Sequence, residues 1–219
     1  MSLKPYQHDF IKWAIEQDAL TFGTYTLKSG RFSPYFYDAA KFNKGSAFLS
    51  VGQFYVDVLQ NLELNYDVVF GSAYKGIPIA LSTVTALKEK YNLDVGYSFN
   101  RKEIKIHGEK GNIVGAPLKG NVLIVDDVIS VGTAIRECLK IVKDNGANPV
   151  GIVIALDRQE KGTGEVTVVQ QIAQEYGVPV ISIITLDNIV QYITEVGGYE
   201  EHLTMIEKYQ DTYGVKKLI

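Results

Sequence analysis

The clearest hydrophobic pattern in the chain is a run of aliphatic residues that ends abruptly in two acids. Residues 122–125 are Val, Leu, Ile and Val, and Asp126 and Asp127 follow directly. Such a run predicts a strand buried on both faces of a parallel sheet, with the acids at its C-terminal edge. The next apolar residues are spaced as on one face of a helix: Ile135, Cys138, Leu139 and Val142. A strand, a short polar loop and a helix are expected in this order.

Further buried runs predict strands at 66–70, 95–99, 149–156 and 177–184. Helical spacing predicts helices at 10–20, 45–62, 167–176 and 199–213, and one that Asp187 would cap and that runs through Ile193. Strands thus alternate with helices over 66–185, which is typical of a doubly wound, mostly parallel α/β sheet. We expect this core at 66–185, a hood at 1–65, and a C-terminal helical segment at 186–219 that packs near the hood.

Residues 22–38 predict a β-hairpin, because apolar positions alternate around a Ser-Gly turn and a run of aromatic residues follows Pro34. Spacing alone favours a core role for these aromatics over a base-binding surface. Arg31, Asp38 and Lys41 are interpreted as solvated charges. Residues 100–112 are rich in charge and glycine without a helical apolar face, and by pattern alone they are an ordinary surface loop.

The loop after Asp127 has the composition of a phosphate site. Backbone N–H groups of 129–133, beside a helix N-terminus, would form an anion cradle, and the hydroxyls of Ser130 and Thr133 would add donors. The carboxylates of Asp126 and Asp127 would accept hydrogen bonds from the hydroxyls of a ribose. The alternative is an ordinary acidic turn between strand and helix, but the aliphatic run, acid pair and small polar loop occurring together argue against it.

Basic residues follow two other predicted strands. A glycine-bracketed loop with Lys75 follows the 66–70 strand, where open α/β sheets bind ligands; the alternative is a tight turn with an exposed lysine. Arg158 follows the 149–156 strand and could present a bidentate fork to a carboxylate; the alternative is a salt bridge near Asp157.

Composition and charge limit the kinds of partner and the location that we expect. The 219 residues carry a net charge of −3, which argues against nucleic acid as the main partner. The single Cys138 falls on an apolar helix face and is expected in the core. No apolar run approaches membrane-spanning length, and the N-terminus lacks a signal-peptide pattern, so a cytoplasmic location is expected.

Four motifs in order resemble one family. The 121–134 stretch resembles the phosphoribosyl-pyrophosphate (PRPP) motif of type I phosphoribosyltransferases, and the 71–78 loop resembles their pyrophosphate loop. Leu-Lys-Ser-Gly-Arg at 27–31, followed by Ser-Pro-Tyr-Phe at 33–36, is similar to the N-terminal signature of orotate phosphoribosyltransferases. Phe-Asn-Arg-Lys-Glu at 99–103, with His-Gly-Glu at 107–109, resembles their catalytic flap, here 100–120.

The resemblance implies roles for individual residues. PRPP would be bound by Lys28, Tyr74, Lys75, Arg101, Lys102, Lys105, His107, Asp126, Asp127, Val128, Ile129, Ser130, Val131, Gly132, Thr133 and Ala134. Orotate would contact Phe36, Tyr37, Ser130 and Arg158. The catalytic residues would be Arg101, Lys105, His107 and Asp127, with Asp127 either binding ribose or stabilising the cationic ring. Val131 and Ser72 depart from the family pattern. The family usually has a small residue or arginine at the position of Val131, and it often has proline at the position of Ser72.

The implied reaction converts orotate and PRPP to orotidine 5′-monophosphate and pyrophosphate, a step in pyrimidine (UMP) biosynthesis. Mg²⁺ would be the cofactor, held by PRPP and water with no direct protein ligand. The family further implies a homodimer whose flap acts on the partner's site, with no nucleic acid and no membrane as partner. Two alternatives stay open: a purine or uracil phosphoribosyltransferase, and a non-catalytic PRPP-sensing regulator.

Overall fold

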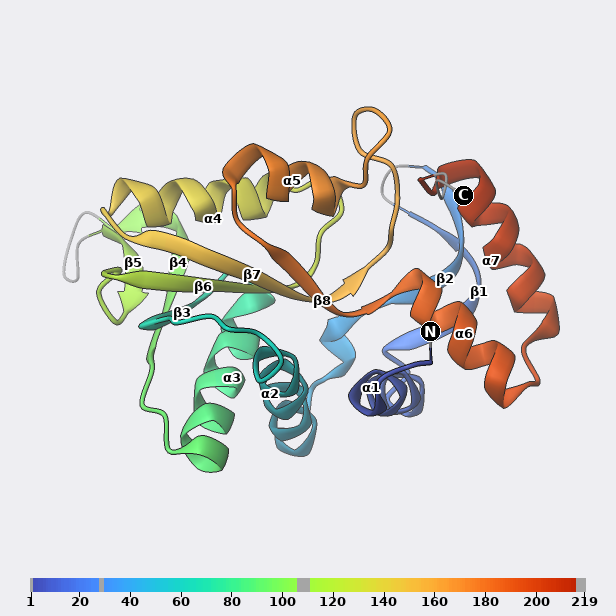
Figure 1. Ribbon diagram of the computed structural model, residues 1–219, viewed down its shortest axis with the longest axis horizontal. Coiled ribbons are helices and arrows are strands. Elements are labelled where there is room, and N and C mark those ends of the chain that lie inside the picture. The colour runs from blue at the N-terminus through green and yellow to red at the C-terminus, as the bar shows by residue number, and fades with distance from the viewer. Residues whose placement is uncertain (1, 28–29, 106–110, 216–219) are drawn as a thin grey trace.

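The structure, a computed structural model, describes residues 2–27, 30–105 and 111–215. One sheet contains β3 Val68–Gly71, β4 Gly96–Lys105, β5 Gly111–Gly115, β6 Asn121–Val128, β7 Asn148–Asp157 and β8 Val180–Thr185. Its helices are α2 Gly45–Leu59, α3 Gly76–Tyr91, α4 Thr133–Asp144 and α5 Val168–Tyr176. Helices α2 and α3 cover one face of the sheet, and α4 and α5 cover the other (Figure 1).

The strand order is β5-β4-β3-β6-β7-β8, and every neighbouring pair is parallel except β4 with β5. This confirms the predicted doubly wound, mostly parallel α/β fold. The chain passes from β3 to β4 on one side and later returns to place β6 on the other side of β3. The order therefore reverses between β3 and β6, and such a reversal opens a crevice at the C-terminal strand ends.

Strand β6 is buried on both faces, as its continuous aliphatic run predicts. Val122 and Ile124 belong to the hydrophobic cluster that includes α4, whereas Leu123 and Val125 belong to the larger cluster on the α2 and α3 face. All four side chains are 0% exposed. On that larger face α2 and α3 approach closely at Gly52, where a Cβ atom would lie 2.2 Å from the Ser82 carbonyl oxygen.

The remaining elements form a hood at one end of the sheet (Figure 1). They are α1 Pro5–Glu16, β1 Leu20–Thr26, β2 Phe32–Tyr37, the short 3₁₀ helix η1 Ala39–Lys41, α6 Leu186–Val196 and α7 Glu200–Tyr213. Strands β1 and β2 pair as the predicted antiparallel hairpin. Helix α7 packs against β2, and the rings of Tyr35 and Tyr209 lie 6.2 Å apart. The predicted division at 65 and 185 remains a prediction.

Several expectations about element bounds are wrong. Leu20 starts β1, because α1 ends at Glu16 and Asp18 adopts a positive φ of 55°. Helix α2 ends at Leu59 instead of reaching Leu62. Thr185, not Asp187, is the N-cap of α6: its hydroxyl accepts the Asn188 N–H, and the Asn188 side chain accepts the Thr185 N–H. That helix also continues to Val196.

Of the charged stretch at 100–112, the structure describes residues 100–105 and 111–112, and these lie in strands instead of the expected loop. Strand β4 continues through it to Lys105, and β5 returns antiparallel, with Phe99 opposite Val114 and Asn100 opposite Ile113. The charged residues of this segment give no strand signal in the sequence. Among the described helices, none is both long and apolar enough to cross a membrane.

Candidate active site

Two loops meet at the point where the strand order reverses. One follows β3 and carries Ser72, Tyr74 and Lys75, and the other follows β6 and leads into α4. The first loop is fixed from its side by Asn100 of β4, whose side-chain oxygen accepts the Ala73 N–H at 3.0 Å. The peptide bond between Ala73 and Tyr74 is cis. The topology thus brings together two of the motifs that the sequence identified separately.

The acid pair lies near the C-terminal end of β6 and is held by backbone donors. Asp126 is 7% exposed, and one of its oxygens accepts the Asp127 N–H at 2.9 Å. Asp127 in turn accepts the Val128 N–H at 2.9 Å. The Tyr55 hydroxyl of α2 donates to the Asp126 carbonyl oxygen at 2.6 Å. Burial, reinforced by the charge of Asp127, raises the pKa of Asp126 to about 7.

The loop after the acid pair combines buried and exposed residues. Ile129 packs into the cluster around α4, whereas Val128 packs against the opposite cluster. Val131 is 74% exposed, so its side chain points toward solvent. Gly132 has a φ of +81° and a Cβ atom there would lie 2.7 Å from the Cδ1 of Ile172, so glycine suits this position. Helix α4 begins at the next residue, Thr133.

Lys75 connects this loop system to the hood. Its Nζ lies 3.1 Å from Oδ2 of Asp127 and 3.3 Å from Oδ1 of Asp38. Burial lowers the pKa of Lys75, but the two carboxylates outweigh burial and leave the pKa above its usual value. The interpretation of Asp38 as a solvated charge is therefore wrong. Tyr74, beside Lys75, is 71% exposed.

Arg158 is held by a network that includes the hood. Its Nε lies 2.5 Å from Oε1 of Glu160, and its Nη2 donates to the Tyr209 hydroxyl at 3.0 Å and to the Ser33 hydroxyl at 3.3 Å. The guanidinium lies 4.6 Å from the centre of the Tyr35 ring. The alternative salt bridge does form here, with Glu160, which stands three residues after Asp157. Whether Arg158 also reads a substrate carboxylate stays a prediction.

Arg31 belongs to the same network. Its Nη1 lies 3.7 Å from Oε2 of Glu160, and its guanidinium lies 4.8 Å from the centre of the Tyr213 ring. The interpretation of Arg31 as a solvated charge is also wrong. Glu160 and Tyr209 were not identified from the sequence. Glu160 stands only two residues after Arg158, a local signal that could have been used, whereas Tyr209 gave none.

The two aromatics expected at orotate differ in environment. Phe36 is 39% exposed, and its ring stacks on Tyr25 with centroids 5.4 Å apart. Tyr37 is 7% exposed and packs against Phe10 and Phe42 in the core. For the Tyr37 ring the structure favours the core role that spacing alone indicated, and only Phe36 presents an aromatic face at the surface.

The flap residues are only partly described. Arg101 and Lys102 lie in β4, and Nζ of Lys102 is 3.6 Å from Oε2 of Glu137 on α4. This ion pair brings the base of the flap beside the helix that follows the phosphate loop. Lys105 is the last residue of β4, and its side chain is not described. Lys28 and His107 lie outside the described residues.

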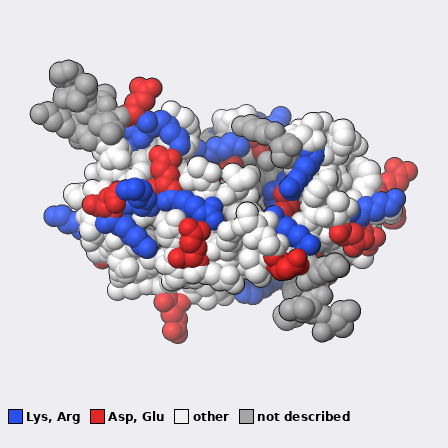
Figure 2. Space-filling view, turned by 90° about the horizontal axis from the view of Figure 1, so that it is seen from above, with Lys and Arg blue, Asp and Glu red and all other residues white. Residues whose placement is uncertain are grey.

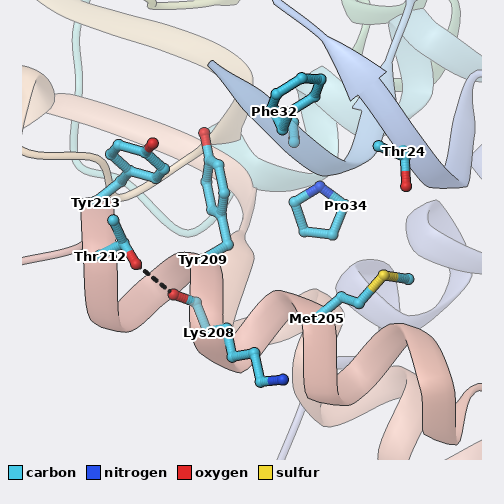
Figure 3. Close-up of a pocket in the computed structure, with 9 residues that line it drawn as sticks. Thr24, Phe32, Pro34, Met205, Lys208, Tyr209, Thr212 and Tyr213 are labelled. Atoms are coloured by element: carbon cyan, nitrogen blue, oxygen red, sulfur yellow. Dashed lines mark hydrogen bonds between the residues drawn. The ribbon is translucent and has the colours of Figure 1, made fainter.

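The described residues contain no cluster of three or more His, Cys, Asp or Glu that could hold a metal ion. A recess of about 310 Å³ lies between the hairpin and α7 (Figure 3). Its lining consists of Thr24, Phe32, Ser33, Pro34, Met205, Lys208, Tyr209, Thr212 and Tyr213. None of these residues belongs to the predicted PRPP set, so the recess is separate from the loops at the strand reversal. On the face that Figure 2 shows, acidic and basic side chains are interspersed.

Comparison with known proteins agrees with these motifs. The phosphoribosyl transferase domain family model matches residues 43–180. Orotate phosphoribosyltransferases of Photobacterium profundum and Cronobacter sakazakii are 48% and 50% identical over 213 residues, which are 97% of this chain and 100% of each relative. The crystal structure of the Francisella tularensis orotate phosphoribosyltransferase superposes with a TM-score of 0.84 at 36% identity, covering 94% of this chain and 99% of that one. The chain belongs to the orotate phosphoribosyltransferase family.

Proposed function

We propose that this chain transfers the 5-phosphoribosyl group of PRPP to orotate, giving orotidine 5′-monophosphate and pyrophosphate for UMP biosynthesis. The observation that carries the proposal is the meeting of the acid pair, the open 129–133 loop and Lys75 at one strand reversal. Near full-length similarity to orotate phosphoribosyltransferases supports the choice of base.

The proposal gives each part of PRPP its binding residues. The 5′-phosphate binds the N–H groups of 129–133, where the N-terminus of α4 contributes its positive dipole. The ribose hydroxyls donate to Asp126 and Asp127, and the diphosphate faces Lys75. When the bond from the anomeric carbon to pyrophosphate breaks, negative charge grows on the departing oxygens. Lysine at that point stabilises the growing charge, and it does so more strongly in a closed site than in water.

The orotate end is assigned to Arg158 and Phe36. Arg158 is 10% exposed, and its Nε and Nη2 are already engaged by protein groups. Among the described residues, none forms a hydrogen bond with its Nη1. The orotate carboxylate therefore binds at the Nη1 side, which is a single-edge contact and not the open bidentate fork suggested by the sequence.

Magnesium belongs to the same proposal. Mg²⁺ prefers oxygen ligands and keeps several waters, so substrate phosphate oxygens can supply most of its shell. In this proposal the carboxylates of Asp126 and Asp127 bind ribose and reach the ion only through PRPP or water, so the ion needs no direct protein ligand. When bound, Mg²⁺ supplies neutralisation of charge on the leaving pyrophosphate.

A homodimer with a flap shared between subunits is the proposed assembly. Leu49 on α2 and Leu81 on α3 are 58% and 51% exposed and line a shallow apolar groove with Phe48 and Ala86. Helix α3 starts directly after the Lys75 loop, so a second copy seated on this groove would lie beside the site. Arg101, Lys105 and His107 would then act on the partner's substrate. A cytoplasmic location remains part of the proposal.

The test is a PRPP-dependent assay with four bases. With Mg²⁺ and PRPP present, the protein should consume orotate, measured as loss of its ultraviolet absorbance, and should act far more slowly on uracil, hypoxanthine or adenine. A preference for one of the other three bases would change the assigned substrate. PRPP binding without turnover of any of the four would instead favour the regulator alternative.

A further inference from the structure

Lys75 is shared between two carboxylates that come from distant parts of the chain. Asp127 lies in β6 of the core, whereas Asp38 follows β2 of the hood. Their oxygens lie 3.1 Å and 3.3 Å from the lysine Nζ, so Lys75 bridges the two carboxylates. Asp127 has a proposed role in ribose binding. Asp38 has none, although it is equally close to the cation.

Asp38 is held in position independently of Lys75. Its Oδ1 also accepts the Ala40 N–H at 3.0 Å, which makes Asp38 the N-cap of η1. The carboxylate is therefore fixed by the backbone that it caps and is not a freely rotating surface group. Its side chain is 29% exposed, and that of Lys75 is 47% exposed, so solvent partly screens the pair.

We infer that Asp38 limits the affinity of the site for the diphosphate end of PRPP. Two effects of its charge act in the same direction: it holds the Lys75 ammonium that the diphosphate needs, and it repels the diphosphate itself. This inference rests on the proposed function, in which Lys75 faces the diphosphate. The same charge should make release of pyrophosphate easier, because Asp38 pairs with Lys75 when the product leaves.

The informative variant is Asp38→Asn. Asparagine keeps a side-chain oxygen for the Ala40 N–H and so preserves the cap, but it removes the negative charge. Direct titration of the whole protein with PRPP, and separately with inorganic pyrophosphate and Mg²⁺, should give dissociation constants lower by about two- to fivefold, the range of one partly exposed ion pair. A mainly structural role for Asp38 would give unchanged or weaker binding, never tighter binding.

Asp57→Asn is the matched control. Asp57 on α2 pairs with Lys90 on α3 at 2.7 Å, so the substitution also breaks one surface ion pair, but away from the loops at the strand reversal. It should leave the affinity for PRPP unchanged. If Asp57→Asn tightens binding as much as Asp38→Asn, a general change in net charge explains the gain and the inference is wrong.

Lys75→Ala separates failure of the inference from failure of the proposed function. Lys75→Ala should weaken PRPP binding, and adding Asp38→Asn to it should restore little, because most of the effect passes through the lysine. If the wild type does not bind PRPP, the proposed function fails. If the wild type binds, Lys75→Ala weakens binding and Asp38→Asn does not tighten it, only the role of Asp38 is refuted. Unchanged binding in Lys75→Ala would remove the assumed role of Lys75 and the inference with it.

Discussion

Asp126 and Asp127 are neighbours in β6, yet their carboxylates have different surroundings. Asp126 is buried beside the loop after β3, and burial raises its pKa from 3.8 to about 7. Asp127 contacts Lys75 at the surface of the site. A carboxyl group with a raised pKa binds a proton in the folded state at pH values where the unfolded chain has released it. Folding stability must then fall as the pH rises through that window.

Asp126→Asn should therefore flatten the dependence of stability on pH. Between about pH 4 and about pH 7, the free energy of unfolding of the wild type should fall by roughly 1 to 4 kcal/mol more than that of the variant, because only the wild type has the native proton to lose. Urea unfolding of both proteins at several pH values measures the difference in slope. The slope is informative even if the substitution shifts stability by a constant amount. Parallel curves would mean that Asp126 titrates normally.

Among individual residues, the sequence identified those whose predicted position follows from their neighbours in the chain. The acid pair lies at the C-terminal end of a buried strand, and the loop after it and Lys75 lie shortly beyond such ends, so pattern alone placed them at one sheet edge. Asp38 and Arg31 were misinterpreted because their partners are remote in the sequence: Lys75 is 37 residues from Asp38, and Glu160 is 129 residues from Arg31. A charged residue without an oppositely charged neighbour in the sequence is interpreted as solvated, although the tertiary structure can bring a partner to it.

The hydroxyl of Tyr209 on α7 contributes to the contact between the hood and the core. The Tyr209 hydroxyl donates to Glu160 Oε1 at 2.7 Å and accepts from Arg158 Nη2 at 3.0 Å. Burial and the neighbouring Glu160 carboxylate raise the pKa of Tyr209 to about 12, so the hydroxyl stays protonated and able to donate at neutral pH. An element outside the sheet thus helps to fix the guanidinium assigned to orotate.

Tyr209→Phe should loosen Arg158 while keeping the ring. Losing a hydrogen bond to charged groups should raise the KM for orotate by about three- to tenfold, with a smaller change in the KM for PRPP. Steady-state kinetics with each substrate varied in turn measures both constants. Tyr213→Phe is the control, because Tyr213 is also on α7 but its hydroxyl forms no hydrogen bond with the residues that the structure describes. An equal rise in both constants would indicate general damage to the hood.

Elements with a strong hydrophobic period could be predicted from the sequence, whereas a strand that forms by pairing with a neighbouring strand could not. The buried strands, the hairpin and α4 were recovered because burial on one or both faces imposes a pattern on the sequence. Strand β5 was missed because its five residues, Gly111–Gly115, include two glycines and lie beside a charged stretch. Its conformation depends on pairing with β4, which is a property of the sheet and not of the segment.

For the whole molecule, the sequence predicted a doubly wound sheet but not its strand order. The order determines which loops meet: β3 lies beside β6, so the Lys75 loop lies beside the acid pair although 50 residues separate Lys75 from Val125. Alternation of strands and helices is compatible with several orders. The family resemblance, not the pattern, supplied the expectation that these loops form one site.

The same sheet order bears on the proposed dimer. Strand β5 is one of the two edge strands of the sheet, and β4 and β5 contain the described residues of the predicted flap, so these residues lie at a border of the sheet. Mixing two inactive variants tests whether the flap acts on the partner. Lys105→Ala lacks the flap lysine, and Asp127→Asn lacks a residue of the site that the flap would cover. With random exchange, half of the dimers are mixed, and one of their two sites combines an intact flap with an intact acid pair. Activity should therefore return to about a quarter of the wild-type value per site.

Two measurements make this outcome decisive. Each variant incubated alone should stay inactive, which excludes recovery by refolding. Differently tagged subunits should form mixed dimers that native mass spectrometry can count. If mixed dimers form in the expected proportion and activity does not return, the flap acts on its own subunit. In that case the apolar groove on α2 and α3 would stabilise the assembly without completing the active site, and each subunit would need only its own Arg101 and Lys105 for turnover.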